Sequence, residues 1–246
     1  MVPTHTDLIY LRDAYLTEFT SLVAAVDEDR VALEATAFYV TGGGQPHDTG
    51  LLVTDGLEGR VVDVTKDEGI AWHHLEGHVP SPGETVFGYV DWPRRHQLMR
   101  THTALHILCG VIWNEFGKAV TGGNMEPLAA RMDFEFDPLP EGFGALMEER
   151  VNAEIVADRL IEVSFLSPDQ ARLDEALIRT KTNLVPDWVS EIRVVDIIGL
   201  DKQADGGTHV RSTGEVGRVR VVKTESKGKG NKRIRIVVED AQGGGQ

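Results

Sequence analysis

The sequence predicts an α+β protein with two parts: a small β-barrel-like N-terminal domain (residues 1–92) and an α+β domain (residues 93–246). Up to about residue 92, short runs of β-branched and aromatic residues are separated by glycine and proline, which is typical of a small barrel. One long stretch of helical periodicity follows, and strand-like runs then return beside shorter helical ones. A chain of 246 residues is long enough for two such domains.

Three segments supply the predicted strands of the N-terminal domain. Residues 30–40 (RVALEATAFYV) are expected to form a pair of strands with a close turn. Residues 59–69 (GRVVDVTKDEG) and 84–92 (ETVFGYVDW) are further strand candidates, and residues 41–50 (TGGGQPHDTG) read as a loop. Several short strands at this spacing favour closure into a barrel over an open sheet.

A single long helix is expected to open the second domain. Asp91 can cap its N-terminus, Pro93 suits its first turn, and Gly117 can end it. One face carries an apolar stripe at 3.6-residue periodicity, made of Leu98, Leu105, Ile112 and Phe116. The helix is therefore expected to pack one face against a core.

The rest of the second domain mixes helices and strands. A second helix is expected over residues 145–158, and strands over 161–166 (IEVSFL) and 192–198 (IRVVDII) flank a short helix opened by SPDQ at 167–170. Residues 217–240 predict a β-hairpin with a Gly/Lys tip. This mixture gives the α+β class.

Composition excludes several classes of protein. No apolar run reaches the roughly 18 residues that a membrane helix needs, the N-terminus lacks a secretory signal, and a single cysteine, Cys109, forms no intramolecular disulfide. We expect a soluble, cytoplasmic protein without a membrane partner.

A net charge of −14 argues against indiscriminate binding of nucleic acid. From Lys202 to Arg235, however, ten basic residues face three acidic ones, which fits either a solvated hairpin or a patch for phosphates.

Two histidines on the long helix are candidate metal ligands. His102 and His106 are one helical turn apart, which places their Cβ atoms roughly 5–6 Å from each other. Two imidazoles so placed can reach one ion, and the alternative is a pair of partly buried, hydrogen-bonded histidines. The metalloprotease motif is excluded because Thr103 stands where that motif needs glutamate.

Two rival sets of ligands are weaker. His74 and His78 are also four residues apart, but a strand would separate them by about 13 Å, too far for one ion. Cys109 lies seven residues from His102, about 10 Å of helix rise, so we expect a small buried helix residue there.

The best candidate for a second pair of ligands is the segment 201–217 (DKQADGGTHVRSTGEVG). Asp205 and His209 are four residues apart, and the two glycines between them let the loop fold sharply. Together with the helix pair they would form a closed four-ligand or an open three-ligand site. The alternative is a plain β-turn with a solvent-facing histidine.

Several motifs together resemble the editing domain of alanyl-tRNA synthetases and its freestanding relatives, the AlaX proteins. The resemblance rests on RTHTALHIL (100–108), DGGTHVRSTGEVG (205–217) and FYVTGGGQPHDTG (38–50), supported by DWPRR (91–95) and KGKGNKRIRI (227–236). It covers nearly the whole chain in the family's order. It implies an N-terminal barrel-like domain, a zinc-binding α+β editing domain, and a stand-alone editor, since no synthetase catalytic domain precedes these motifs.

The resemblance implies one zinc ion per chain held by His102, His106, Asp205 and His209. The family's pattern has cysteine where this sequence has Asp205. Aspartate is also a zinc ligand, at about 2.0–2.2 Å, and as a harder donor it lets Mn or Fe compete better than at a thiolate site. Asp205 could instead hold a water or orient a histidine from outside the ligand set, and loss of the metal is the third alternative.

The resemblance implies hydrolysis of the ester that joins a wrong amino acid, chiefly serine and sometimes glycine, to tRNA(Ala). An editing pocket that hydrogen-bonds the serine hydroxyl can reject alanine strongly. Thr41 and Gln45 carry suitable groups, and close backbone approach is expected from the glycines. The expected substrate-binding set is Thr41, Gly43, Gly44, Gln45, Gly206, Gly207 and Thr208. The alternative for residues 41–45 is an ordinary Gly-rich connection; the Walker and G-x-G-x-x-G patterns are absent from this stretch.

The tRNA acceptor end is expected to be held through its phosphates. Our candidates are Arg94, Arg95, Lys227, Lys229, Lys232 and Arg233. Three other functions compete with editing: a non-catalytic tRNA-binding zinc module, a zinc hydrolase of another small ester, and a structural zinc module with a closed shell.

Overall fold

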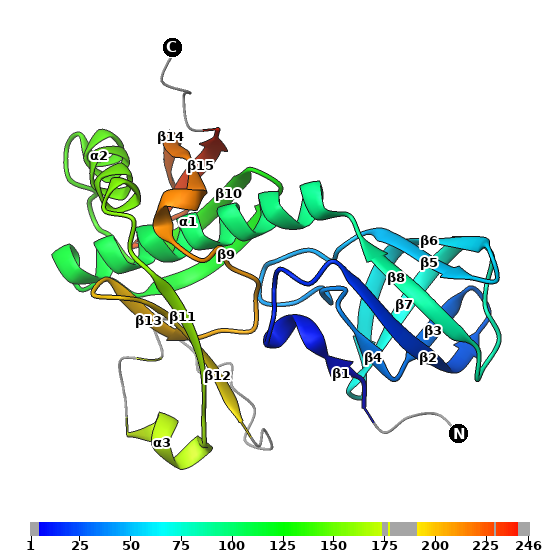
Figure 1. The fold of residues 1–246 in the computed structure, drawn as a ribbon. Helices are drawn as coiled ribbons and strands as arrows, with labels where there is room; N and C mark the ends of the chain where they lie inside the picture. Colours follow the sequence, from blue (N-terminus) through cyan, green and yellow to red (C-terminus); the bar gives the residue numbers. More distant parts are fainter. Residues whose placement is uncertain (1–4, 174–176, 178–190, 229, 241–246) are drawn as a thin grey trace, which may run out of the picture. The chain divides into compact units, whose positions relative to one another are not determined.

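The computed structural model describes residues 5–173, 177, 191–228 and 230–240 (Figure 1). The chain divides into two compact units, Met1–Gln97 and Leu98–Gln246, and each is described by itself. Within the described residues, no helix combines the length and the apolar character that crossing a membrane requires.

The first unit contains a closed six-stranded barrel, as the sequence predicted, in the strand order β2-β3-β7-β6-β5-β8. Along β2, exposed and buried residues alternate, so that one face of the strand packs into the barrel. Val31, Leu33, Phe38, Val61 and Val86 are fully buried in the core of this unit. The barrel strands are β2 (Glu18–Asp27), β3 (Arg30–Leu33), β5 (Gly50–Thr54), β6 (Leu57–Asp67), β7 (Ile70–Gly77) and β8 (Thr85–Val90).

The predicted strand pair at 30–40 is wrong in its pairing. Two strands do form there, β3 and β4 (Ala35–Thr36), but β3 pairs with β2 and β7 inside the barrel. β4 pairs in parallel with β1 (Asp7–Leu8), which the 3₁₀ helix η1 (Ile9–Leu11) follows. Only Glu34 separates β3 from β4, and one residue is too few to reverse the chain into an antiparallel pair.

The long helix α1 (Trp92–Phe116) forms where the sequence predicted it. Asp91 Oδ1 accepts a hydrogen bond from Arg94 N (3.2 Å), and Gly117, at φ 62°, ends the helix with its N–H on Trp113 O (2.8 Å). Residues 98–112 are all buried, so this stretch is enclosed on every side and not only along one stripe.

The first turns of α1 belong to the first unit. The Trp92 ring lies 5.3 Å from the ring of Tyr15, and Arg95 is hydrogen-bonded to Asp48, both within that unit. The boundary between the units therefore falls after Gln97 and not after residue 92 as the sequence suggested.

The second unit holds two sheets, one in the order β14-β15-β10-β9 and one in the order β11-β12-β13. The predicted hairpin is present as β14 and β15, and β11 and β12 are antiparallel neighbours. The strands of these two sheets are β9 (Val120–Glu126), β10 (Ala129–Phe134), β11 (Ile161–Leu166), β12 (Ile192–Ile197), β13 (Asp201–Ala204), β14 (Arg218–Ser226) and β15 (Lys232–Glu239).

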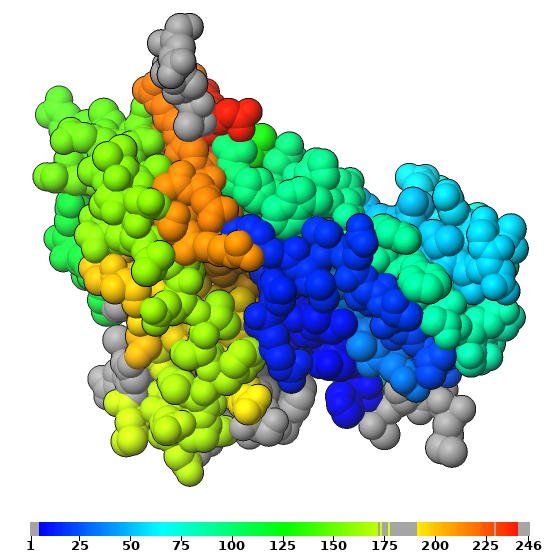
Figure 2. Space-filling view, in the orientation of Figure 1, coloured from blue at the N-terminus to red at the C-terminus, as the bar shows by residue number. Residues whose placement is uncertain are grey.

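Two predicted helices are present in this unit. α2 (Phe143–Val156) begins two residues before the predicted 145–158, and α3 (Pro168–Arg172) opens with a capping box at Ser167. α2 lies beside β14 at the surface (Figure 2). Asn152 both donates to Val219 O (2.7 Å) and accepts from Val219 N (3.0 Å), so the helix satisfies the backbone of an edge strand.

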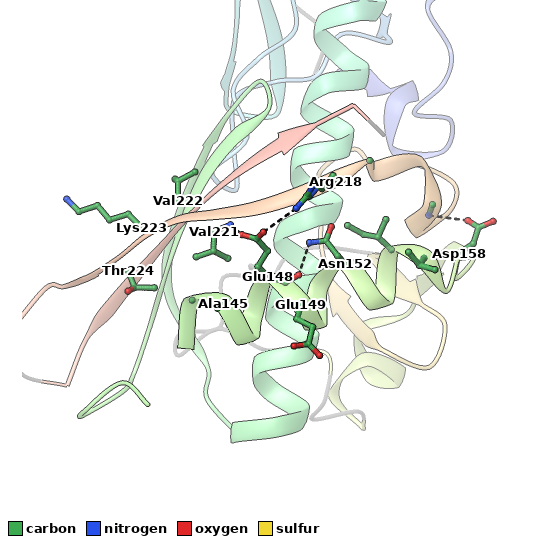
Figure 3. Close-up of a pocket in the computed structure, with 15 residues that line it drawn as sticks. Ala145, Glu148, Glu149, Asn152, Asp158, Arg218, Val221, Val222, Lys223 and Thr224 are labelled. Carbon is green, nitrogen blue, oxygen red and sulfur yellow. Dashed lines mark hydrogen bonds and ion pairs between the residues drawn. The ribbon is translucent and has the colours of Figure 1, made fainter. Parts of the chain in front are cut away.

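A groove of about 1150 Å³ runs between α2 and β14 (Figure 3). Two of its carboxylates have partners within the groove: Glu148 accepts from Val221 N (2.9 Å) and faces Arg218, and Asp158 accepts from Gly214 N (3.1 Å). None of the candidate metal ligands lines this groove.

Candidate metal centre

The structure brings the four predicted ligands together in the second unit. His102 and His106 face the cluster from the buried part of α1, and Asp205 directly follows β13. His209 lies four residues later, before the 3₁₀ helix η3 (Thr213–Val216). One ligand atom from each of the four residues lies within 4.8 Å of the others.

The separations suit a small divalent cation. His209 Nε2 lies 3.1 Å from Asp205 Oδ2, and His102 Nε2 lies 3.7 Å from Asp205 Oδ1. Ligand bonds of 2.0–2.1 Å in a tetrahedron separate neighbouring donors by about 3.3 Å. Three imidazoles and one carboxylate are borderline-to-hard donors, so the chemistry of the set also fits zinc, manganese or iron.

Hydrogen bonds outside the cluster fix two of the imidazole rings. His106 Nδ1 lies 3.2 Å from Asp201 Oδ2, and His209 Nδ1 lies 3.1 Å from Thr103 Oγ1. In both rings Nδ1 is thereby engaged, which leaves Nε2 for the cluster. Ring orientation fixed in this way is typical of metal-ligating histidines.

At three of the four residues, the electrostatics favour the protonation states that metal binding needs. Burial lowers the pKa of His102 well below its ordinary value and that of His209 to about 4. Burial raises the pKa of Asp205, but its interaction with the neighbouring His102 and the hydrogen bond from His209 bring it well below the usual range. Burial lowers the pKa of His106, yet the hydrogen bond to Asp201 and the Asp205 charge raise it overall. His102 and His209 are thus neutral and Asp205 is ionised at neutral pH.

The loop that carries Asp205 is tied down on both sides. Asp205 Oδ2 accepts from Gly207 N (2.7 Å), and Arg193 donates to the Asp205 carbonyl (2.8 Å). Gly206 is exposed, whereas Gly207 and Thr208 are buried beside His209. The three predicted substrate-binding residues of this loop therefore adjoin the cluster in sequence.

The rejected ligand candidates lie elsewhere. Cys109 is 1% exposed and its Sγ accepts from Gln203 Nε2 (3.4 Å), as expected of a small buried helix residue. His74 is a strand residue of β7 with its Nε2 on Thr65 Oγ1 (3.1 Å), and His78 directly follows that strand.

Comparison with known proteins identifies the family of this chain. Residues 192–235 match the family profile described as threonyl and alanyl tRNA synthetase second additional domain, and residues 5–94 match that of class II (A) tRNA synthetases. The chain is 35% identical over 244 residues to the alanyl-tRNA editing protein AlaX-M of Saccharolobus solfataricus, covering 95% of this chain and 99% of that protein. The chain belongs to the AlaX-M family.

Other relatives extend the comparison. The AlaX-M protein of Methanosarcina barkeri is 35% identical over 242 residues, which are 96% of this chain and 100% of that protein. The alanine–tRNA ligase of Pyrococcus furiosus is 35% identical over 233 residues, covering 93% of this chain but 25% of the ligase. This AlaX-M chain thus corresponds to one part of a longer ligase.

The glycine-rich motif of this AlaX-M chain lies in the first unit. Thr41 is exposed, and its Oγ1 accepts from His47 N (3.1 Å) and lies 3.2 Å from His47 Nδ1. Gly43 and Gly44 have φ angles of 58° and 87°, a region that favours glycine, and so permit the tight turn. Gln45 is 1% exposed.

The predicted tRNA-binding residues differ in their exposure. Lys227 is exposed at the hairpin tip, while Lys232 Nζ donates to Ser226 Oγ (3.2 Å) and Arg233 forms a two-bond pair with Asp133 (2.7 and 2.8 Å). Arg94 donates to the carbonyl of His47 (3.0 Å). Lys229 lies outside the described residues.

Arg95 requires a correction. Its side chain is 0% exposed and forms an ion pair with Asp48, with further hydrogen bonds to the carbonyls of Ala14 (2.8 Å) and Ala37 (2.6 Å). All of its donor groups thus face the interior of the first unit, so Arg95 holds this unit together and does not contact a phosphate.

Sequence reasoning missed the residues that support the cluster. Asp201, Thr103 and Arg193 contact ligands from β13, α1 and β12 respectively. Thr103 could have been noticed because it lies between the two helix histidines. Asp201 and Arg193 carried no local signal, since their roles depend on how β12 and β13 approach α1.

Proposed function

We propose that this protein is a trans-editing hydrolase that removes a wrong amino acid from tRNA(Ala), chiefly from seryl-tRNA(Ala) and also from glycyl-tRNA(Ala). The observation that carries the proposal is the cluster of His102, His106, Asp205 and His209 in a chain that matches AlaX-M proteins over their full length. Those relatives are named alanyl-tRNA editing proteins.

The chemistry of ester hydrolysis suits this donor set. A bound divalent metal, for which zinc is our proposal at one ion per chain, supplies Lewis-acid activation of water and of the ester carbonyl. The residues of the chain that would hold it are His102, His106 and His209 through Nε2, with Asp205 as the fourth donor. Their task is to keep the metal in one geometry within a buried, weakly screened surrounding.

Selectivity for serine is assigned to the glycine-rich motif. Thr41 has an exposed hydroxyl, and its contacts with His47 fix where that hydroxyl lies. A hydroxyl that pairs with the serine side chain would be left unpaired by alanine, so correctly charged tRNA is spared. Gln45, Gly43 and Gly44 lie in the same turn. Gly206, Gly207 and Thr208, which adjoin the metal cluster in sequence, are further proposed substrate-binding residues.

Transfer RNA is proposed to contact this chain through cations that remain accessible. Lys227 is the most exposed of the described candidates, and Lys232, Arg233 and Arg94 also present part of their side chains. Lys229 is included from the sequence alone. Contacts of this kind with phosphates position the acceptor end without reading its sequence.

The decisive experiment measures deacylation of seryl-tRNA(Ala), glycyl-tRNA(Ala) and alanyl-tRNA(Ala) by the purified protein, before and after chelation and with zinc added back. Rapid, zinc-restored loss of serine with alanine spared is the expected result. Turnover of a free serine ester at the same rate as seryl-tRNA would favour a general zinc hydrolase. If the zinc-loaded protein binds tRNA tightly but does not deacylate it, the result would favour a non-catalytic module and overturn the proposal.

A further inference from the structure

We propose that Asp201 is a positioning residue for the metal centre: it holds the His106 ring through Nδ1 so that Nε2 faces the other three ligands. The inference rests on the metal site proposed above and adds a residue outside the set of ligands. Asp201 begins β13, and Asp205 directly follows this strand. The same strand would thus supply both a residue that positions His106 and the start of the loop that carries two ligands.

The contact itself is direct and buried. Asp201 Oδ2 lies 3.2 Å from His106 Nδ1, and the Asp201 side chain is 0% exposed. The same Asp201 oxygen accepts from Gln203 Nε2 (2.6 Å), so it acts as an acceptor and the His106 Nδ1–H donates to it. That leaves His106 Nε2 with a free lone pair pointing away from Asp201, which is the state that a metal ligand needs.

A second residue holds the carboxylate in place. Gln203 Nε2 donates to the same Asp201 oxygen (2.6 Å) and also reaches Cys109 Sγ (3.4 Å) on α1. Because a buried polar group is costly unless it is hydrogen-bonded, the donation from Gln203 stabilises the Asp201 carboxyl in this position. The carboxylate is thereby restricted to one position against His106.

The backbone approach that allows this contact is also specific. A Cβ atom on Gly110 would lie 2.9 Å from Asp201 Cβ and 3.0 Å from Leu200 Cγ, so a larger residue would push the start of β13 away from α1. Asn114 ties the same turn to the helix by donating to Leu200 O (3.0 Å). His106, Gly110 and Asn114 follow one another at four-residue spacing, so one helix face receives Asp201.

The other supported ring is held differently. His209 Nδ1 faces the hydroxyl of Thr103, a neutral partner. Asp201 therefore gives His106 an anionic partner that raises its strength as a donor, in the way known for carboxylate–histidine–metal arrangements. Removing the charge while keeping the shape should weaken metal binding, even though all four ligands remain.

The test compares the full chain with Asp201→Asn. Zinc affinity is measured by competition with a chromophoric chelator, and the visible absorption spectrum of the cobalt-loaded protein reports the ligand geometry. We expect zinc affinity to fall by about 10- to 100-fold and the cobalt spectrum to change. Asp133→Asn is the matched control, because it removes another largely buried carboxylate of the same unit, paired with Arg233, and should leave zinc affinity unchanged.

Gln203→Leu gives a second test should Asp201→Asn fail to fold. It keeps Asp201 and all four ligands but removes the amide that donates to the Asp201 carboxyl, and zinc affinity should fall in the same direction. Wild-type affinity and an unchanged cobalt spectrum in folded Asp201→Asn would overturn the inference and leave the proposed metal site intact. Absence of zinc binding by the wild-type protein would overturn both.

Discussion

His209 Nε2 lies 3.1 Å from Asp205 Oδ2, four residues earlier in the same loop. This one separation places a nitrogen and an oxygen donor within reach of one cation. The carboxylate also accepts from Gly207 N (2.7 Å), so its position is set by the backbone and not by the metal alone. In the proposed centre, Asp205 would thus supply a carboxylate where the motif that the sequence resembles has a thiolate.

Exchanging Asp205 should change which metal the centre prefers. Asp205→Cys keeps a fourth ligand but replaces hard oxygen by soft sulfur, so affinity for zinc relative to manganese should rise. Asp205→Ala removes the ligand and should weaken zinc binding at least tenfold. Metal competition monitored by equilibrium dialysis measures both ratios. Identical zinc-to-manganese preference in wild type and Asp205→Cys would show that Asp205 is not a ligand.

Removing the Thr41 hydroxyl should impair removal of serine without affecting the metal. Thr41→Val loses one hydrogen bond to the substrate, which is worth about 1 kcal/mol, so kcat/KM on seryl-tRNA(Ala) should fall by about fivefold to tenfold. Thr41→Ser retains the hydroxyl and is the matched control. Thr41 has no part in selectivity if Thr41→Val deacylates seryl-tRNA(Ala) as fast as wild type.

Neutralising the hairpin tip should flatten the salt dependence of tRNA binding. For every phosphate that is no longer neutralised by a lysine, the slope of log affinity against log salt becomes shallower by about 0.7–0.9. The double variant Lys227→Gln, Lys232→Gln should therefore show a shallower slope between low and moderate salt in a filter-binding titration. Lys66→Gln changes an exposed lysine of the barrel and serves as the control. Equal slopes in all three proteins would rule out the hairpin as a phosphate site.

Acid should destabilise the barrel through His73. Burial lowers the pKa of His73 to about 4, while its ring pairs with Thr36 Oγ1 (2.8 Å) and the Val31 carbonyl (3.1 Å). In the unfolded chain His73 takes up a proton below about pH 6.5, whereas in the folded chain it does so only near pH 4. The contribution of the neutral, buried His73 ring to stability is therefore complete above pH 6.5 and is lost as the pH falls towards 4. The difference corresponds to about 3 kcal/mol of unfolding free energy.

Urea denaturation at several pH values measures this dependence. His73→Gln should be less stable than wild type at pH 7, yet should lose less stability between pH 6.5 and pH 4. Parallel pH profiles for the two proteins would contradict the assignment, because the buried ring would then not be the titrating group.

Much of the fold could be predicted from local signals. The limits of α1 follow from Asp91 and Gly117, and the alternation of polar and apolar residues marks the final hairpin. β9 was missed because VTGGNME contains two glycines and little β propensity, so its strand conformation is imposed by pairing with β10. β7 was missed because two adjacent histidines, the buried His73 and the half-buried His74, interrupt its apolar pattern.

In the candidate site, the proposed ligands could be predicted from the sequence, but the residues that support them could not. The pairs His102–His106 and Asp205–His209 show in the sequence as two four-residue spacings, and the family resemblance joined them. Asp201 had no such signal, since its role arises only when β13 approaches Gly110 of the helix. Arg95 shows the opposite failure: an arginine in a basic dipeptide was predicted to be a surface cation, but its partner Asp48 lies 47 residues away in sequence.

The pair formed by Arg95 and Asp48 limits how this chain can be divided. Ending a fragment at residue 92 would keep the barrel strands but discard the buried cation that faces Asp48. The backbone amide of Tyr39, which also donates to this carboxylate (2.6 Å), carries no charge that could replace it. A buried carboxylate that loses its cation costs about 3–5 kcal/mol, a large share of the stability of a small domain. The first turns of α1 are thus part of the folding unit of the barrel. A fragment that contains the barrel should fold by itself only if it also includes these helical turns.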